Sequence, residues 1–321
     1  METIIEKVDP SLIISELTPD RLLRPTNKGD NEIYVVDAFN APNTMREIGR
    51  LREIAFRDAG GGTGKSCDID EFDTMERPCR QMIVWNPQAK EIIGGYRFLL
   101  GEDMHFTDGV PDIAISHMFR FSERFLSEFL PKTIELGRSF VTLEYQTTKA
   151  GPKAIYALDN LWDGLGALTV KYPQIEYLLG KFTMYPSYGA YHRDILLGFL
   201  HKHFPDPDEL VRPITPLPSH ADDPEIRALF TGSNFKEDLK ILNHIIREAG
   251  SNIPPLVNAY MALSPTMRLF GTAINHEFGD VEETGIFFKI DEIFEEKKHR
   301  HVDTYHGPVS DYRTPIQHKP L

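Results

Sequence analysis

Residues 133–145 read TIELGRSFVTLEY, in which β-branched and aromatic residues surround the charged segment from Glu135 to Arg138. These residue types favour extended backbone, so we predict a strand that carries its charges beside Gly137. Downstream, helical spacing over residues 157–172 and 188–204 alternates with a further strand pattern over 175–184. Strands that alternate with helices indicate a layered α/β sheet.

The residues before this stretch continue the alternation. Residues 32–39 predict a buried strand, and residues 43–58 carry apolar side chains at helical spacing. Two β-rich runs, 80–85 and 91–100, are separated by Asn86 and Pro87 and predict a hairpin. Residues 113–129 have helical spacing again, so helices and strands interleave through the first two hundred residues.

The C-terminal part departs from this pattern. Five of the fourteen residues 205–218 are proline, which predicts an inserted excursion over 205–250 that ends in a polar helix. Residues 268–277 and 284–290 predict two last strands at the sheet edge. We expect one domain over residues 1–321, with a charged, histidine-rich and loose tail over 295–321.

Composition excludes several classes of protein. The 321 residues contain 35 Lys and Arg against 48 Asp and Glu, and the net charge of -13 repels nucleic acid. Two cysteines, Cys67 and Cys79, are too few for a disulfide framework and fit a reducing compartment. Because there is neither a long apolar run nor a signal-peptide pattern, we expect a cytoplasmic protein.

Two motifs suggest chemistry that their surroundings argue against. Residues 59–66, AGGGTGKS, match a loose form of the phosphate-binding loop, but an arginine-rich helix precedes them and residues 67–76 hold five acids and no base. His201 and Asp206 have the H-x-x-x-x-D spacing of some glycerolipid acyltransferases, yet His201 ends a predicted helix. The histidine pairs at 201/203 and 299/301 lack a third ligand, so we predict no metal site.

A third group of polar residues is spread over several predicted elements. Arg52 and Phe56 share a helix face at a spacing of four residues, and Arg97 lies inside a β-rich run. Ordinary ion pairs at the rim of the sheet are one explanation for such charges. Together, however, they predict one polar centre, formed by Arg52, Phe56, Asp70, Asp73, Arg97, Glu135 and Arg138.

The order of elements resembles the GNAT superfamily, in which acyl thioesters insert between two splayed central strands. Strings such as ELGRSFVTLEYQ, VWNPQAKEIIGGYR and LWDGLGALTVKYPQIEYLLG resemble the ornithine/glycine N-acyltransferases of aminolipid synthesis, often labelled hemolysin-like. This resemblance covers roughly residues 33–293. The polar centre is also similar to that of the acyl-homoserine lactone synthases, but their tryptophan between Phe56 and Asp70 is absent, which favours the aminolipid family.

The resemblance implies a GNAT-like mixed sheet with splayed central strands and transfer of a (3-hydroxy)acyl chain to the α-amine of glycine or ornithine. It implies an acyl-thioester cosubstrate, acyl carrier protein or acyl-CoA, and no tightly bound cofactor or metal. Residues 146–153, QTTKAGPK, lack the complete coenzyme A phosphate grip. The resemblance implies acyl carrier protein as the donor and partner, and we expect it to bind Arg46, Arg50, Lys149 and Lys153. The alternative is that Arg46 and Arg50 form a solvated helix face.

The implied chemistry assigns roles within the polar centre. We expect Glu135 to accept the proton of the amine, backbone N–H groups near Gly137 and Ser139 to bind the oxyanion, and Tyr188 to protonate the leaving thiolate. Arg138, with Arg97, Asp70 and Asp73, would hold the loop over the site and position the carboxylate of the amino acid.

Two other functions stay open: a signal synthase similar to the lactone synthases, and a non-enzymatic hemolysin-like interaction protein. A lipidic product also suggests peripheral contact with the inner face of the cell membrane.

Overall fold

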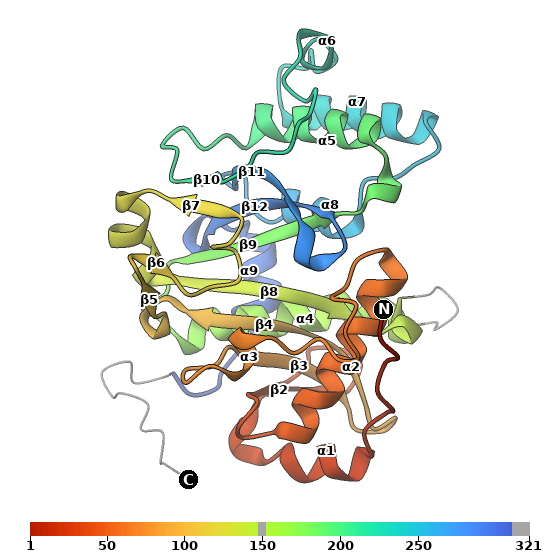
Figure 1. Cartoon of the computed structure of the whole chain (residues 1–321), viewed down its shortest axis with the longest axis vertical. Coiled ribbons are helices and arrows are strands. Elements are labelled where there is room, and N and C mark those ends of the chain that lie inside the picture. The colour runs from red at the N-terminus through yellow and green to blue at the C-terminus, as the bar shows by residue number, and fades with distance from the viewer. Residues whose placement is uncertain (147–151, 310–321) are drawn as a thin grey trace.

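The structure, a computed structural model, describes residues 1–146 and 152–309. One eight-stranded mixed sheet runs through it in the order β1-β2-β3-β4-β8-β9-β12-β11 (Figure 1). Its strands are β1 (Leu22–Pro25), β2 (Glu32–Val36), β3 (Arg80–Asn86), β4 (Glu91–Leu100), β8 (Thr133–Val141), β9 (Tyr177–Met184), β11 (Arg268–Asn275) and β12 (Val281–Lys289). Neighbouring strands are antiparallel except β8 and β9, which are parallel. The expected α/β class with a mixed sheet is confirmed.

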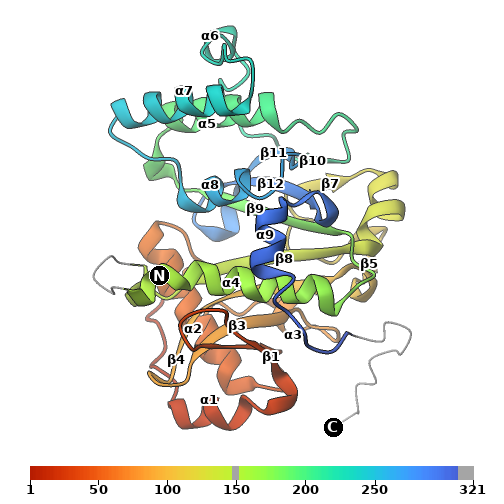
Figure 2. The ribbon, with the colours of Figure 1, turned by 180° about the vertical axis from the view of Figure 1, so that it is seen from behind.

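Helices cover both faces of the sheet. Helix α2 (Pro42–Ala59) lies on the face seen in Figure 1, and α4 (Pro152–Lys171) and α9 (Glu295–His301) lie on the face seen in Figure 2. The remaining helices are α1 (Pro10–Glu16), α3 (Glu71–Thr74), α5 (Ala190–His203), α6 (Pro224–Arg227), α7 (Phe235–Glu248) and α8 (Pro255–Met261). Short strands pair outside the main sheet, namely β5 (Phe106–Thr107) with β6 (Val110–Pro111), and β7 (Phe119–Phe121) with β10 (Val211–Pro213).

Helix α2 owes its position to an apolar stripe. Met45, Ile48 and Ala55 on the helix are buried in one core cluster with Ile83 and Trp85 of β3. Pro42 occupies the first turn, where its missing N–H costs nothing, and Gly60 ends the helix with a left-handed φ of 98°. The same helix thereby brings its polar residues over the middle of the sheet.

Helix α4 packs closely on the opposite face. Leu161, Leu165 and Leu168 are buried in the largest core cluster together with Phe98 and Ile134 from the sheet. A Cβ at Gly164 would lie 2.3 Å from the sulfur of Met82, so only glycine permits this approach of helix and sheet.

The central strands β8 and β9 separate after a short paired segment. They pair at Thr133–Tyr177, Ile134–Leu178 and Glu135–Leu179, whereas β9 pairs with β12 over eight positions. Residues 136–139 of β8 are partly exposed although β8 lies in the middle of the sheet. We call the unpaired region beyond Glu135 and Leu179 the β8–β9 opening.

A β-bulge lies at the edge of this opening. Gly95 of β4 pairs with Phe140 and Arg97 pairs with Gly137, so two residues of β8, Arg138 and Ser139, lie opposite one residue of β4. Arg138 has a left-handed φ of 48°, which is unusual for a side chain of its size. A bulge removes backbone groups from the regular ladder and redirects side chains.

Three segments differ from the sequence-based predictions or extend them. The helix predicted over 113–129 is wrong, because this segment contains β7 and a single π-helical turn over Phe125–Phe129. The tail expected to be loose from residue 295 begins with α9, which a 2.7 Å contact between His301 Nδ1 and the buried Asp163 Oδ1 attaches to α4. Residues 205–250 contain β10, α6 and α7, and α7 packs on α5.

Candidate active site

The α2 face of the sheet carries a buried group of charged side chains. The guanidinium of Arg52 lies 3.3 Å from Asp73, that of Arg97 lies 2.6 Å from Asp70 and 3.4 Å from Asp73, and that of Arg138 lies 3.0 Å from Asp68. We call this group the acidic-loop cluster, and it comprises Arg52, Asp68, Asp70, Asp73, Gln81, Arg97 and Arg138. The polar residues that the sequence placed in different elements therefore meet.

Local structure holds the acidic loop in place. Asp70 caps α3 by accepting hydrogen bonds from the backbone N–H groups of Phe72 and Asp73, and the Asp73 carboxylate accepts one from the Asp70 N–H in return. Burial raises the pKa of Asp70, but Arg97 and Arg138 outweigh it and hold that pKa well below its usual range. Asp70 therefore remains ionised at neutral pH.

Glu135 lies where β8 and β9 separate. Its side chain is 2% exposed and accepts no hydrogen bond from the described residues. Burial raises its pKa, while the positive charges of Arg97 and Lys181 oppose the rise. A carboxylate with a raised pKa is a stronger proton acceptor once ionised.

Gly137 leaves space beside this carboxylate. A Cβ at Gly137 would lie 3.7 Å from Glu135 Oε1 and 4.0 Å from Arg97 Nε. The Nε atom of Arg97 is buried and also has no hydrogen-bond partner in the described part of the chain. A buried donor without a described partner, near Gly137 and the Glu135 carboxylate, points to a polar ligand at this position.

A second ion pair lies on the far side of the β8–β9 opening. Lys181 of β9 pairs with Glu283 of β12, which also accepts hydrogen bonds from Thr183 at 3.3 Å and Asn275 at 3.2 Å. Sequence reasoning missed this group, and it missed Asp68 and Gln81 in the acidic-loop cluster. The available signal was a lysine inside the otherwise apolar strand sequence YLLGKFTM.

The other candidate residues take different positions. Phe56 stacks edge-on against Phe278 at 5.0 Å, and Phe278 lies 4.4 Å beneath the Arg138 guanidinium. Tyr188 follows β9 and packs against the core on the α4 face, whereas Glu135 faces α2. Its hydroxyl is buried without a described partner, and burial raises the pKa of Tyr188 to about 12. Ser139 lies in the bulge.

The glycine loop at 59–66 has a structural role. The buried Glu53 carboxylate accepts hydrogen bonds from the backbone N–H of Thr63 at 3.1 Å, the Thr63 hydroxyl at 2.7 Å and the backbone N–H of Gly64 at 2.8 Å. These donors would face phosphate in a phosphate-binding loop. Here an internal carboxylate occupies them, so the loop is not arranged to bind a nucleotide.

The structure describes only part of the basic surface that we expect to bind acyl carrier protein. Arg46 is exposed on α2, whereas Arg50 is paired with Glu47 at 2.7 Å, so its charge is compensated. Lys153 lies in the first turn of α4, and Lys149 lies outside the described residues.

The histidine motifs also have local partners. His201 Nδ1 lies 3.2 Å from Asp222, while Asp206 contacts Arg268 at 3.1 Å, so the H-x-x-x-x-D spacing does not form a pair. Residues 1–146 and 152–309 contain no group of three metal-binding side chains. No helix of this part of the chain has the length and apolar character that crossing a membrane requires.

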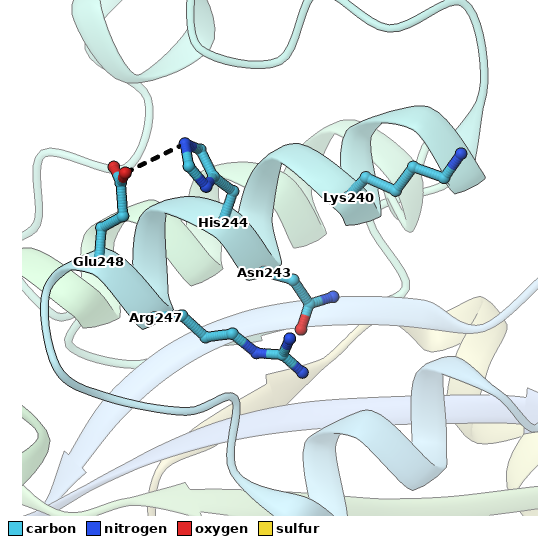
Figure 3. A pocket seen from close by; sticks show the side chains of 5 residues that line it. All are labelled: Lys240, Asn243, His244, Arg247 and Glu248. Atoms are coloured by element: carbon cyan, nitrogen blue, oxygen red, sulfur yellow. Dashed lines mark ion pairs between the residues drawn. The ribbon is translucent and has the colours of Figure 1, made fainter.

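A surface hollow lies on α7, away from the residues described above. Lys240, Asn243, His244, Arg247 and Glu248 line it, and His244 Nε2 lies 3.4 Å from Glu248 (Figure 3). It shares no residue with the acidic-loop cluster or the β8–β9 opening.

Part of the chain matches a known family model. Residues 51–153, which include the whole acidic-loop cluster, match the family model described as Acetyltransferase (GNAT) domain. A solved structure, the AHL synthase LasI, aligns with a TM-score of 0.38 and 12% identity over 89% of this chain and 100% of that chain.

Two curated relatives are much more similar. A glycine N(alpha)-acyltransferase of Bacteroides thetaiotaomicron is 64% identical over 306 residues, which are 95% of this chain and 91% of the relative. A glycine N(alpha)-acyltransferase of Phocaeicola vulgatus is 59% identical over 306 residues, 95% of this chain and 94% of the relative. Because identity is this high over nearly the whole length, the chain belongs to the GNAT-type glycine N(alpha)-acyltransferase family and is an N-acyltransferase.

Proposed function

We propose that this enzyme transfers a (3-hydroxy)acyl chain from an acyl thioester to the α-amine of glycine. The observation that carries the proposal is the buried Glu135 carboxylate, which accepts no hydrogen bond from the described residues, at the point where β8 and β9 separate. The relatives named glycine N(alpha)-acyltransferase support glycine as the acceptor rather than ornithine.

During the reaction the glycine nitrogen must lose two protons and the leaving sulfur must gain one. Glycine arrives as an ammonium near neutral pH, and ionised Glu135 accepts one proton to produce the free amine. The nitrogen attacks the thioester carbonyl, a C–N bond forms, and the C–S bond breaks as the tetrahedral intermediate collapses. The nitrogen loses a second proton to solvent, and the departing sulfur gains one from Tyr188. Solvent then reprotonates Tyr188, and Glu135 releases its proton to solvent. The balance is one N-acylglycine, one thiol and one released proton.

The bulge at Arg138 and Ser139 supplies the proposed oxyanion site. Backbone N–H groups that a bulge removes from the ladder are free to donate to the negative oxygen of the intermediate. The bulge borders the β8–β9 opening, so a thioester inserted there would present its carbonyl to these groups. Tyr188 would meet the sulfur from the α4 face.

The acidic-loop cluster has a positioning role in this scheme. Its arginines are already paired with the loop aspartates, so they hold the loop in place and are not free to bind substrate. The aspartates in turn fix the orientation of Arg97. The positive charge of Arg97 favours the ionised form of Glu135. Phe56 supports Arg138 through Phe278.

We further propose acyl carrier protein as the donor and aminolipid synthesis as the setting, in the cytoplasm with peripheral contact at the inner face of the membrane. An acidic carrier would bind the cationic residues Arg46, Arg50, Lys149 and Lys153. Because Glu47 neutralises the charge of Arg50, we expect Arg46 to contribute more than Arg50 to binding of the carrier protein. The whole chain would form one domain with an insertion over 205–250, which the continuation of the sheet into β11 and β12 supports.

The test is an acylation assay with purified protein and isotope-labelled glycine or ornithine. Acyl carrier protein and coenzyme A thioesters are supplied in parallel, and mass spectrometry identifies the product. We expect linear N-acylglycine, formed fastest from the carrier-protein thioester. A lactone product would favour the signal synthase. No acylated product with any donor, together with lysis of erythrocytes, would contradict the proposal and favour a hemolysin-like protein.

A further inference from the structure

Lys181 faces Glu135 across the β8–β9 opening. Glu135 pairs with Leu179, and Lys181 lies two residues further along β9, so both side chains are on the same face of the sheet. With strands about 4.8 Å apart and a rise of about 3.3 Å per residue, their Cα atoms are separated by at least roughly 8 Å. The side chains therefore border one space from its two strands.

The Lys181 ammonium has donors to spare. It carries three N–H groups and is hydrogen-bonded only to Glu283 among the described residues. Glu283 is 1% exposed and is fixed by Thr183 and Asn275 as well. The carboxylate thus holds the ammonium in position without using its full hydrogen-bonding capacity.

The neighbouring arginines are engaged by carboxylates of the acidic loop. Arg138 contacts Asp68 and Asp70. Arg52 contacts Asp73, and Arg97 contacts Asp70 and Asp73 through Nη1. Lys181 instead lies on β9, on the other side of the β8–β9 opening, and is paired with a carboxylate outside the acidic loop.

We propose that Lys181 binds the α-carboxylate of the acceptor amino acid, with Glu283 as the positioning residue that holds the ammonium. This inference rests on the proposed function. In glycine the nitrogen and a carboxylate oxygen lie about 3 Å apart, as the N–Cα and Cα–C bond lengths require. One zwitterion can therefore place its nitrogen at Glu135 and its carboxylate at Lys181, which directs the nitrogen to the thioester beside the bulge.

The experiment compares glycine with glycinamide, which has the same amine but no carboxylate. In Lys181→Met we expect kcat/KM for glycine to fall roughly 10- to 100-fold, mostly through KM, because a charge-assisted hydrogen bond is lost. For glycinamide we expect a change of less than roughly 2-fold, because this acceptor never made the contact. The readout is the ratio of the two kcat/KM values in each protein.

Two further variants separate binding from folding. In Lys181→Met the Glu283 carboxylate stays buried without its partner. The double variant Lys181→Met/Glu283→Gln removes this charge as well, and it should lose the preference for glycine over glycinamide to the same extent. Lys202→Met removes another lysine paired with a buried carboxylate, Asp238 at 2.6 Å, but outside the site, and should keep the wild-type ratio.

If kcat/KM fell equally for glycine and glycinamide in the double variant, the ratio of the two values would stay at its wild-type level. That result would overturn the assignment of Lys181. Failure of the wild-type enzyme to acylate glycine from any donor would instead reject the proposed function.

Discussion

Replacing Asp73 by asparagine tests whether the acidic-loop cluster holds the site together. Asp73 is fully buried, and its Oδ2 lies 3.3 Å from Arg52 and 3.4 Å from Arg97, while Oδ1 accepts a hydrogen bond from Gln81 at 2.8 Å. In Asp73→Asn, Arg97 keeps Asp70, but Arg52 keeps only the neutral Gln81. A buried charge left without its partner costs about 3–5 kcal/mol.

This cost translates into a measurable shift in melting temperature. At about 2.1 cal/mol/K per residue, unfolding 321 residues has an entropy of roughly 0.7 kcal/mol/K, so Tm should fall by roughly 4–7 °C. Thermal and urea unfolding monitored by circular dichroism measure it. The matched control is Asp208→Asn, which breaks contacts to Arg268 and Arg124 at a carboxylate that is 36% exposed and should cost less than about 1 kcal/mol. Equal losses in the two variants would refute the reasoning.

Three other substitutions probe separate parts of the structure. Gly279→Ala should lower the free energy of unfolding by about 1–3 kcal/mol more than Gly109→Ala does. Both glycines have φ near 80°, but a Cβ at Gly279 would lie 3.1 Å from Gly61 Cα, whereas a Cβ at Gly109 would have no atom within 4 Å. Equal urea midpoints would contradict this. Tyr188→Phe should lower kcat by roughly 100-fold with little change in the KM for glycine, and an unchanged kcat would remove Tyr188 from proton transfer. Glu135→Gln should be more stable than wild type at alkaline pH: burial raises the pKa of Glu135, so the wild type loses stability as pH rises through that pKa, and the difference should vanish below the ordinary carboxylate pKa. A constant difference in urea unfolding between pH 4 and pH 8 would contradict it.

Elements with a strong local pattern could be predicted from the sequence. The strand at 133–145 corresponds to β8, the predicted hairpin corresponds to β3 and β4, and the amphipathic run at 43–58 corresponds to α2. Such elements bury one apolar face, and the periodicity of that face is visible in the chain itself.

The failures came from interactions between distant residues. Residues 113–129 have helical spacing, yet Phe119 and Phe125 are buried against strands β11 and β12 through Phe270 and Phe287, and this packing overrides the local pattern. Helix α9 depends on Asp163, which is 138 residues away from His301. Neither contact has a local signature.

The same distinction applies to the candidate site. Charges inside β-rich runs identified Arg97, Glu135 and Arg138 as unusual, and the structure brings them to one region. Lys181 and Glu283 are separated by 102 positions, and they meet only because β9 pairs with β12 in one register. This contact depends on which strands are neighbours in the sheet, and no local sequence pattern indicates that order.

The role of Glu135 as the proton acceptor at the β8–β9 opening can be tested in single-turnover acylation of glycine. Glu135→Gln preserves the shape of the side chain and removes its basicity, so the rate should fall by roughly 100- to 10,000-fold with the fold intact. Asp238→Asn, at a buried carboxylate paired with Lys202 outside the opening, is the matched control and should retain the wild-type rate. A Glu135→Gln enzyme that acylates glycine at the wild-type rate would contradict the mechanism.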